Sequence, residues 1–216
     1  MTQPRALVVD FYGVLTEALD TAMSAWCAAD GIDYERFRDV MGEWLGPEGY
    51  ANARLNPVYA LERGEMAVPD FEVRLAERLR QATDEPLDPR GLVERMFQRF
   101  EHAPDMAGLV RRARRAGIAT ALLSNSWGDQ YLRDGWDEMF DVVVISGEVG
   151  MRKPEQRIFA FTAERLGVPA EATVFVDDHV SNIRAGREFG WVCVHHVEYQ
   201  QTATELEALF GLPLNA

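Results

Sequence analysis

The sequence predicts an α/β fold, in which a doubly wound, parallel, Rossmann-like sheet carries an all-helical cap subdomain inserted after its first strand. Three observations lead to this prediction. Short, continuous apolar runs recur along the chain, as expected of strands buried on both faces of a parallel sheet. Helical segments with recognisable ends separate the later runs. A much longer helical stretch separates the first run from the second.

Five apolar runs are the predicted strands. The first covers residues 6–9, reads Ala-Leu-Val-Val and is closed by Asp10. Such a short run, apolar at every position, is typical of a strand buried on both faces. The other four runs follow much later in the chain, at residues 118–123, 141–145, 173–176 and 191–194.

The segments between the later runs carry residues that start and stop helices. Pro104 begins one helix, which ends at Gly117. Pro154 begins another, which ends at Gly167, and a third covers residues 181–189. Strands that alternate with helices pair in parallel through right-handed crossovers, and this gives a doubly wound sheet. Ligands bind outside the carboxyl ends of such strands, so the residues that follow each strand are the candidates for a functional site.

Residues 16–102 interrupt this alternation and are interpreted as helices joined by turns. Residues 71–79 place three apolar side chains on one helical face, as expected of a helix with a buried side. We therefore divide the chain into a core, residues 1–15 and 103–216, and a helical cap, residues 16–102. Because the cap follows the first strand directly, we expect it to lie over the carboxyl edge of the sheet as a lid.

Composition restricts the possible partners. Of the 216 residues 47% are hydrophobic, and the formal net charge of −13 disfavours nucleic acid and anionic membrane surfaces as partners. An anionic small-molecule substrate would need local positive charge to offset that field. Cys27 and Cys193 cannot form a disulfide framework, and neither a signal peptide nor a membrane-length apolar run is evident. We therefore expect a cytoplasmic protein, and the oligomeric state stays open.

Chemically informative residues follow four of the predicted strands: Asp10, Ser124 with Asn125, Lys153, and Asp177 with Asp178. Ser, Asn and Asp after a strand are common helix caps, but capping alone does not explain all four sites together. Lys153 is the only lysine among 22 basic residues. Its ammonium is a compact point charge that the planar guanidinium of arginine cannot replace in a small space, so it is a candidate for chemistry.

Taken in order, these motifs resemble those of the haloacid dehalogenase superfamily of hydrolases. They read Asp-x-x-Gly-Val-Leu from residue 10, Leu-Ser-Asn from residue 123, Lys-Pro from residue 153 and Val-Asp-Asp-x-x-x-Asn from residue 176. The resemblance covers the whole chain, including the cap, and looks closest to the branch with the phosphatase domain of soluble epoxide hydrolases. It implies a magnesium-dependent phosphatase that acts on a small phosphorylated metabolite, because most members of the superfamily are phosphatases.

The resemblance also implies roles in binding and transferring a phosphoryl group. Asp10 would be the nucleophile and would form an aspartyl-phosphate intermediate. Ser124 would bind a phosphoryl oxygen through its hydroxyl group, and Asn125 would do so through its backbone N–H. Lys153 would neutralise negative charge in the transition state. Arg54, in the cap, is the candidate for an anionic group elsewhere on the substrate.

A Mg²⁺ site is implied by the same resemblance. Asp10, Asp177 and the backbone carbonyl of Tyr12 would ligate the ion, since Mg²⁺ prefers carboxylate and water oxygens. Asp178 would orient a metal-bound water or pair with Lys153. Three carboxylates that converge without a cation would repel one another, so the arrangement itself favours a metal.

Tyr12 departs from the phosphatase pattern. Phosphatases of this superfamily usually carry a second aspartate two residues after the nucleophile, as general acid and base. Strand periodicity would return the side chain of Tyr12 to the face of Asp10. However, a phenol with a pKa of about 10 is a poor base at neutral pH. We therefore expect phosphatase activity that is slow or restricted to good leaving groups.

Two alternatives stay open. Asp-x-Tyr-Gly resembles the first motif of the 2-haloacid dehalogenases, in which the aspartate displaces halide without a metal. Those enzymes resemble Ser-Ser-Asn at the fourth motif, however, and Asp177 with Asp178 would repel a carboxylate substrate unless a cation is present. The other alternative is a non-catalytic protein that binds phosphoryl ligands. The retained Asp10, Ser124 and Lys153 disfavour it.

Overall fold

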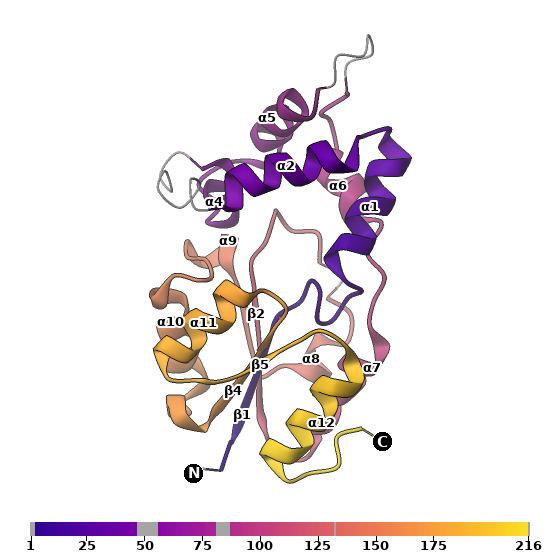
Figure 1. Cartoon of the computed structure of the whole chain (residues 1–216). Coiled ribbons are helices and arrows are strands. Elements are labelled where there is room, and N and C mark those ends of the chain that lie inside the picture. The colour runs from indigo at the N-terminus through magenta and orange to yellow at the C-terminus, as the bar shows by residue number, and fades with distance from the viewer. Residues whose placement is uncertain (1–2, 47–55, 81–86, 132, 216) are drawn as a thin grey trace.

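The computed structural model describes residues 3–46, 56–80, 87–131 and 133–215. Its core is a five-stranded sheet in the order β3-β2-β1-β4-β5, and every neighbouring pair of strands is parallel. The cap helices lie beyond one end of the strands, and the N-terminus lies at the other end (Figure 1). The predicted doubly wound sheet with a helical cap is confirmed.

The five strands lie within a residue or two of the predicted runs: β1 Ala6–Val9, β2 Ala119–Ser124, β3 Val142–Ile145, β4 Thr173–Asp177 and β5 Val192–His195. β1 is central and pairs with β2 on one side and β4 on the other. Val9 lies opposite both Leu122 and Val176, so these strands end at nearly the same level. Asp10 and Asp177, each the next residue, therefore meet at one edge of the sheet.

Helices fill the connections: α1 Leu19–Asp30, α2 Tyr34–Leu45, α4 Pro57–Glu62, α5 Val68–Leu79, α6 Leu92–Phe97, α7 Pro104–Arg115, α8 Trp136–Met139, α9 Ser146–Val149, α10 Gln156–Leu166, α11 Val180–Phe189 and α12 Tyr199–Phe210, with a 3-10 turn at Ala170–Ala172. The predicted helices of the core correspond to α7, α10 and α11. Among the described residues, α1, α2, α4, α5 and α6 lie within the predicted cap, and the other helices lie within the predicted core.

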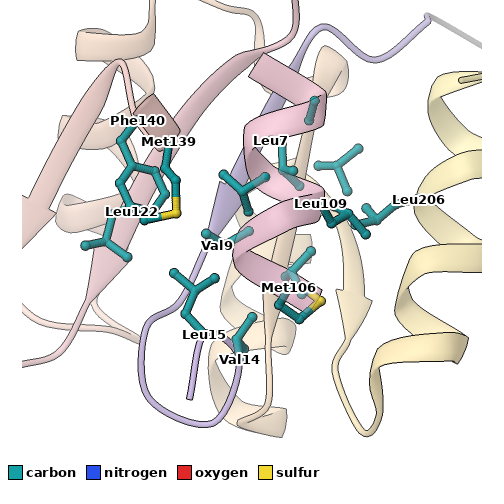
Figure 2. Close-up of a cluster of buried hydrophobic side chains, with 14 of the residues drawn as sticks. Leu7, Val9, Val14, Leu15, Met106, Leu109, Leu122, Met139, Phe140 and Leu206 are labelled. Atoms are coloured by element: carbon teal, nitrogen blue, oxygen red, sulfur yellow. The ribbon is translucent and has the colours of Figure 1, made fainter. Parts of the chain in front are cut away.

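Alternate residues of each strand face opposite layers of helices, as strand geometry requires. Leu7 and Val9 of β1 join a buried cluster with α7, α8 and α12. Figure 2 shows both side chains in this cluster, together with Leu109 of α7 and Leu206 of α12. Val8 faces the other way and packs with residues of α10 and α11. Helices therefore cover both faces of the sheet, and only the strand ends remain available for a site.

The cap has a hydrophobic core of its own. Phe71, Leu75 and Leu79 of α5 are buried in it, which confirms the predicted apolar face of that helix. At the base of the cap, Thr16 and His102 form an isolated antiparallel bridge, so the incoming and outgoing chains run side by side. This pairing supports the proposed boundaries of the cap, residues 16–102, which stay a prediction.

Two properties of the whole chain complete the description. Cys27 is buried and Cys193 is half-buried, and both are free thiols. No helix among the described residues is both long enough and apolar enough to cross a bilayer.

Candidate active site

Three strand ends and one loop bring the predicted site residues together at the carboxyl edge of the sheet. Asp10 follows β1, Ser124 is the last residue of β2, and Asp177 is the last residue of β4. Lys153 lies between α9 and α10 in the connection that follows β3. All four side chains are buried, because the cap lies over this edge. The edge therefore concentrates ionisable groups that are shielded from solvent.

Lys153 is the centre of an ionic cluster. Its Nζ lies 2.8 Å from Oδ2 of Asp10 and 2.6 Å from Oδ2 of Asp177, and the lysine side chain is fully buried. These two ion pairs, rather than one with Asp178, are the pairs that Lys153 forms. A buried cation this close to two carboxylates is stabilised by both and in turn holds both in place.

Hydrogen bonds from α11 fix the carboxylate of Asp177. Asn182 donates from Nδ2 to both carboxylate oxygens, at 3.0 and 3.1 Å. The backbone N–H of His179 donates to Oδ1 at 2.8 Å. A carboxylate with this many donors keeps one orientation, so Asp177 is already positioned to act as a ligand. Asn182 belongs to the quoted fourth motif, but its role as the partner of Asp177 was not predicted.

Asn125 positions the backbone of Lys153 through two hydrogen bonds. The Asn125 side chain accepts a hydrogen bond from the Lys153 backbone N–H at 2.8 Å and donates one to the Lys153 carbonyl at 3.0 Å. This reciprocal pair joins the end of β2 to the lysine loop. The sequence suggested a role for the Asn125 backbone N–H only, because a contact between side chain and distant backbone leaves no spacing pattern.

Burial and charge alter the proton affinities of the cluster. Burial raises the pKa of Asp10 well above its usual value, Lys153 opposes this shift, and the charges of Asp177 and Asp178 add to it. Burial alone would lower the pKa of Lys153, but its two carboxylate partners outweigh burial and raise it. Burial, followed by the charge of Asp177, raises the pKa of Asp178 to about 6. The cluster therefore has an excess of negative charge that one lysine does not cancel.

The donor set fits a hard divalent cation. Asp10, Asp177 and Asp178 each offer a carboxylate oxygen, and these three oxygens lie within 4.8 Å of one another. Gly13 allows this convergence, because a Cβ at that position would lie 2.4 Å from Oδ2 of Asp178. Its φ of +78° also favours glycine. Mg²⁺ takes such oxygens readily and would relieve their mutual repulsion.

Tyr12 is not placed as strand periodicity suggested. β1 ends at Val9, and the chain turns after Asp10, so alternation no longer applies. The ring of Tyr12 packs against Phe97, Phe100 and Tyr131, with centroids 4.9, 5.1 and 5.5 Å away. Burial and the charge of Asp10 raise the pKa of its phenol, which stays protonated at neutral pH. Tyr12 therefore lines the site as an aromatic group, without the properties of a base.

Two other predicted residues need separate comment. Ser124 is fully buried, and its Oγ lies 2.8 Å from the hydroxyl group of Tyr131. Either oxygen can donate, so Tyr131 orients the Ser124 hydroxyl. No sequence motif pointed to Tyr131. Arg54, the predicted cap residue for an anionic group, lies outside the described residues.

Glu62, at the end of α4, connects the cap to the site through three contacts. It forms a buried ion pair with Arg152 and accepts a hydrogen bond from Nε1 of Trp127 at 3.3 Å. Nδ2 of Asn125 lies 3.4 Å from its Oε2. The guanidinium of Arg152 also stacks on the Tyr59 ring at 3.8 Å. We call Glu62, Asn125, Trp127 and Arg152 the Glu62 junction. Its contacts were not predicted, because Glu62 is far from the other three residues in the chain.

A cavity of about 390 Å³ lies between the cap and this edge of the sheet. Asp10, Tyr12, Asn125 and Asp178 line it from the core side. Helices α1, α2 and α6 contribute to the opposite wall. Asp10 and Asp178 therefore face a pocket of the size that small-molecule sites have.

A buried aspartate, a lysine and a set of carboxylates lie together at the ends of parallel strands, where the motifs predicted a hydrolytic site. A family model described as haloacid dehalogenase-like hydrolase matches residues 4–190. The chain belongs to this family, and the predicted resemblance is confirmed.

Two relatives show the branches that the chain resembles. Phosphoserine phosphatase from Thermus thermophilus is 34% identical over 132 residues, which make up 57% of this chain and 53% of the relative. Bifunctional epoxide hydrolase 2 from Rattus norvegicus is 31% identical over 106 residues, 45% of this chain and 19% of the relative. The chain thus spans about half, or less, of the length of these curated relatives.

Solved structures of two kinds share the fold. A HAD family enzyme from Bacteroides thetaiotaomicron, crystallised with magnesium and inorganic phosphate, has a TM-score of 0.63 at 17% identity and covers 90% of this chain and 94% of its own. A dehalogenase has a TM-score of 0.66 at 22% identity and covers 97% and 98%. Identities this low show the common fold, and they do not separate phosphatase from dehalogenase.

Proposed function

We propose that this protein is a magnesium-dependent phosphatase of small phosphate esters, with Asp10 as the nucleophile. The observation that carries the proposal is the convergence of Asp10, Asp177 and Asp178 within 4.8 Å around a single lysine. This excess of carboxylates suits a divalent cation and a phosphoryl group. It suits a small carboxylate substrate poorly, because like charges would repel it.

The reaction would proceed through two displacements at phosphorus. A carboxylate oxygen of Asp10 attacks phosphorus, the O–P bond to Asp10 forms, and the P–O bond to the alcohol breaks. The departing alkoxide takes a proton from water. A second water molecule then attacks phosphorus and gives one proton to the hydroxide left by the first, the bond to Asp10 breaks, and inorganic phosphate leaves with the carboxylate regenerated. Two easier steps replace one difficult step.

The other residues bind and orient the phosphoryl group. The ammonium of Lys153 lies 2.8 Å from Oδ2 of Asp10 and would offset the charge that gathers near it in the transition state. The hydroxyl of Ser124 and the backbone N–H of Asn125 would donate to phosphoryl oxygens. Tyr12 supplies no base, so leaving groups that need little protonation should react fastest.

Mg²⁺ would be held by Asp10, Asp177 and the backbone carbonyl of Tyr12, with Asp178 nearby. When bound, the ion would act as a Lewis acid that polarises a phosphoryl oxygen. The chain positions these ligands in advance: Asn182 fixes Asp177, and Gly13 leaves room for Asp178. The carboxylates therefore need little rearrangement to accept the ion.

A 2-haloacid dehalogenase is the second candidate, and Tyr12 is the observation that favours it, because Asp-x-Tyr resembles the first motif of those enzymes. The same aspartate would then displace halide from carbon. Asp177 and Asp178 weigh against this alternative, since both lie beside the nucleophile. A non-catalytic phosphoryl-binding protein is less favoured still, because the ion-paired Asp10 and Lys153 are intact.

Phenyl phosphate hydrolysis with and without Mg²⁺, followed by halide release from 2-chloropropionate, separates the three candidates. We expect Mg²⁺-dependent release of inorganic phosphate and no halide. Mg²⁺ should also increase the free energy of unfolding, by about 2.7 kcal/mol at 100 times its Kd, and so raise the melting temperature. Asp177→Asn should abolish that rise. Halide release without metal would overturn the proposal in favour of a dehalogenase, and the absence of both reactions would favour a binding protein.

A further inference from the structure

We infer that the substrate of this site carries its phosphate on an apolar alcohol or phenol, and that the cap selects for this apolar group. The inference rests on the proposed phosphatase function. It goes beyond that function because neither the motifs nor the acidic cluster specify the leaving group. It comes from the chemistry of the cavity wall opposite Asp10.

The cap contributes a largely apolar surface to the cavity. Leu19 and Met23 of α1, Met41 and Leu45 of α2, and Phe97 of α6 all line it. Each of these side chains is only partly buried, in contrast to the fully packed interior of the cap. Their exposed parts therefore face the cavity and offer area that an apolar ligand could cover. Burial of such area is the main favourable term in the binding of apolar groups.

Three polar cap side chains among the described lining residues already have partners. Glu62 is paired with Arg152. The hydroxyl group of Tyr34 donates to Asp20 at 3.0 Å. These groups would have to give up existing bonds to bind a hydroxyl, amino or carboxylate group of a substrate, and for the buried Glu62 the loss of its partner is costly.

Arg38 is the charged cap residue that needs separate comment. Its side chain is 59% exposed and lies 3.4 Å from Glu35. Most of this side chain is therefore in contact with solvent. Polar and apolar functions are thus separated along the cavity: the phosphoryl group belongs at the strand ends, and the organic part belongs against α1, α2 and α6.

The size and adaptability of the cavity determine how selective the site is. The cavity volume of about 390 Å³ exceeds what a phosphoryl group alone requires. Methionine side chains are flexible and adapt to ligands of different shape, so Met23 and Met41 would accept a range of alkyl or aryl groups. We therefore expect a preference for apolar character rather than for one particular outline.

A series of 4-alkylphenyl phosphates tests the inference, because the leaving groups in it have closely similar acidity. The alkyl group is lengthened from methyl to butyl in single-carbon steps, and phosphotyrosine serves as the polar member. We expect kcat/KM to rise about threefold to fourfold with each methylene until the cavity is full. Phosphotyrosine should be the poorest substrate. A flat or falling series, with phosphotyrosine equal to or better than phenyl phosphate, would overturn the inference.

Matched variants place the effect on the cap. Met23→Gln with Met41→Gln should flatten the dependence of kcat/KM on alkyl chain length. Met66→Gln is the control, since Met66 is a partly buried cap methionine that packs on the same hydrophobic cluster and does not line the cavity. An equal flattening in the Met66 variant would show that the selectivity does not come from the cavity wall.

Calorimetry on the metal-free protein separates this inference from the proposed function. Binding of 4-butylphenol should show a negative heat-capacity change and be weakened by the double methionine variant. If phenyl phosphate is not hydrolysed but 4-butylphenol binds in this way, the phosphatase proposal fails and the apolar site stands. If phenyl phosphate is hydrolysed and 4-butylphenol does not bind, the inference fails and the phosphatase proposal stands.

Discussion

The two walls of the cavity are built on different principles. On the core wall, buried charges are held by ion pairs and hydrogen bonds, as Lys153 is between Asp10 and Asp177. On the cap wall, the side chains of Met23 and Met41 are apolar, flexible and partly exposed. A rigid, charged wall suits a single reaction, whereas an adaptable apolar wall suits recognition of the rest of the substrate. The difference suggests that the core determines the reaction and the cap determines the substrate.

Removal of the core cation should have the largest effect in this comparison. Lys153→Met leaves two buried carboxylates without their common partner, so kcat for phenyl phosphate should fall about 10²–10³-fold. Lys153→Arg should rescue little, because the planar guanidinium does not fit where an ammonium lies between two oxygens.

Arg157→Met is the matched control for that experiment, because Arg157 is a nearby cation with a side chain that is 54% exposed. Its loss should leave kcat unchanged. If Lys153→Met keeps kcat within tenfold of the natural protein, the buried charge of Lys153 does not contribute to catalysis as proposed.

The Glu62 junction, where the two walls meet, provides the next test. Glu62→Ala leaves the Arg152 side chain, which is 8% exposed, without its carboxylate partner. Loss of one member of a buried ion pair should lower the free energy of unfolding by about 3–5 kcal/mol, measured by urea denaturation. Glu65→Ala removes a carboxylate that is 55% exposed and should cost at most about 1 kcal/mol. Equal effects of the two variants would show that the junction is no more than a surface contact.

Tyr12 is an aromatic residue on the otherwise charged core wall, and its replacement gives the smallest expected effect. Tyr12→Asp adds the carboxylate that phosphatases of this family usually carry two residues after the nucleophile. We expect kcat for alkyl phosphates to rise about 10-fold, since their leaving groups most need a proton. Stability should fall, because the loss of the ring removes its contacts with Phe97 and Phe100.

Tyr12→Asn is the control, because it removes the same ring without adding an acid. A gain in the aspartate variant that the asparagine variant lacks would assign the effect to proton transfer. If Tyr12→Asp folds, binds Mg²⁺ and gains nothing on any ester, the phosphatase proposal is weakened.

The sequence predicted those parts of the molecule that depend on local pattern. Continuous apolar runs located the strands, and the residues after them located Asp10, Ser124, Lys153 and Asp177, because parallel strands end at one edge. Such patterns can be recognised in the sequence because they involve residues that are adjacent in the chain.

The rest depends on contacts between distant segments. Glu62 meets Arg152 across 90 positions of sequence, and Tyr131 reaches Ser124 from a loop, so neither contact has a spacing signal. The predicted orientation of Tyr12 was wrong for a different reason. The strand ends at Val9, and a turn directs the Tyr12 side chain toward the aromatic cluster. The apolar wall of the cavity likewise appears only when α1, α2 and α6 are assembled.

The central claim is that the carboxylate of Asp10 accepts the phosphoryl group, and trapping that group tests it most directly. Phenyl phosphate and Mg²⁺ are mixed with the protein, the reaction is stopped with acid within one turnover, and the peptide that contains Asp10 is sequenced by mass spectrometry. We predict one phosphoryl group on Asp10 in the natural protein and none in Asp10→Asn, which should remain folded and inactive. Phosphate release by a folded Asp10→Asn protein at a rate near that of the natural protein, or a phosphoryl group on another residue, would contradict the account.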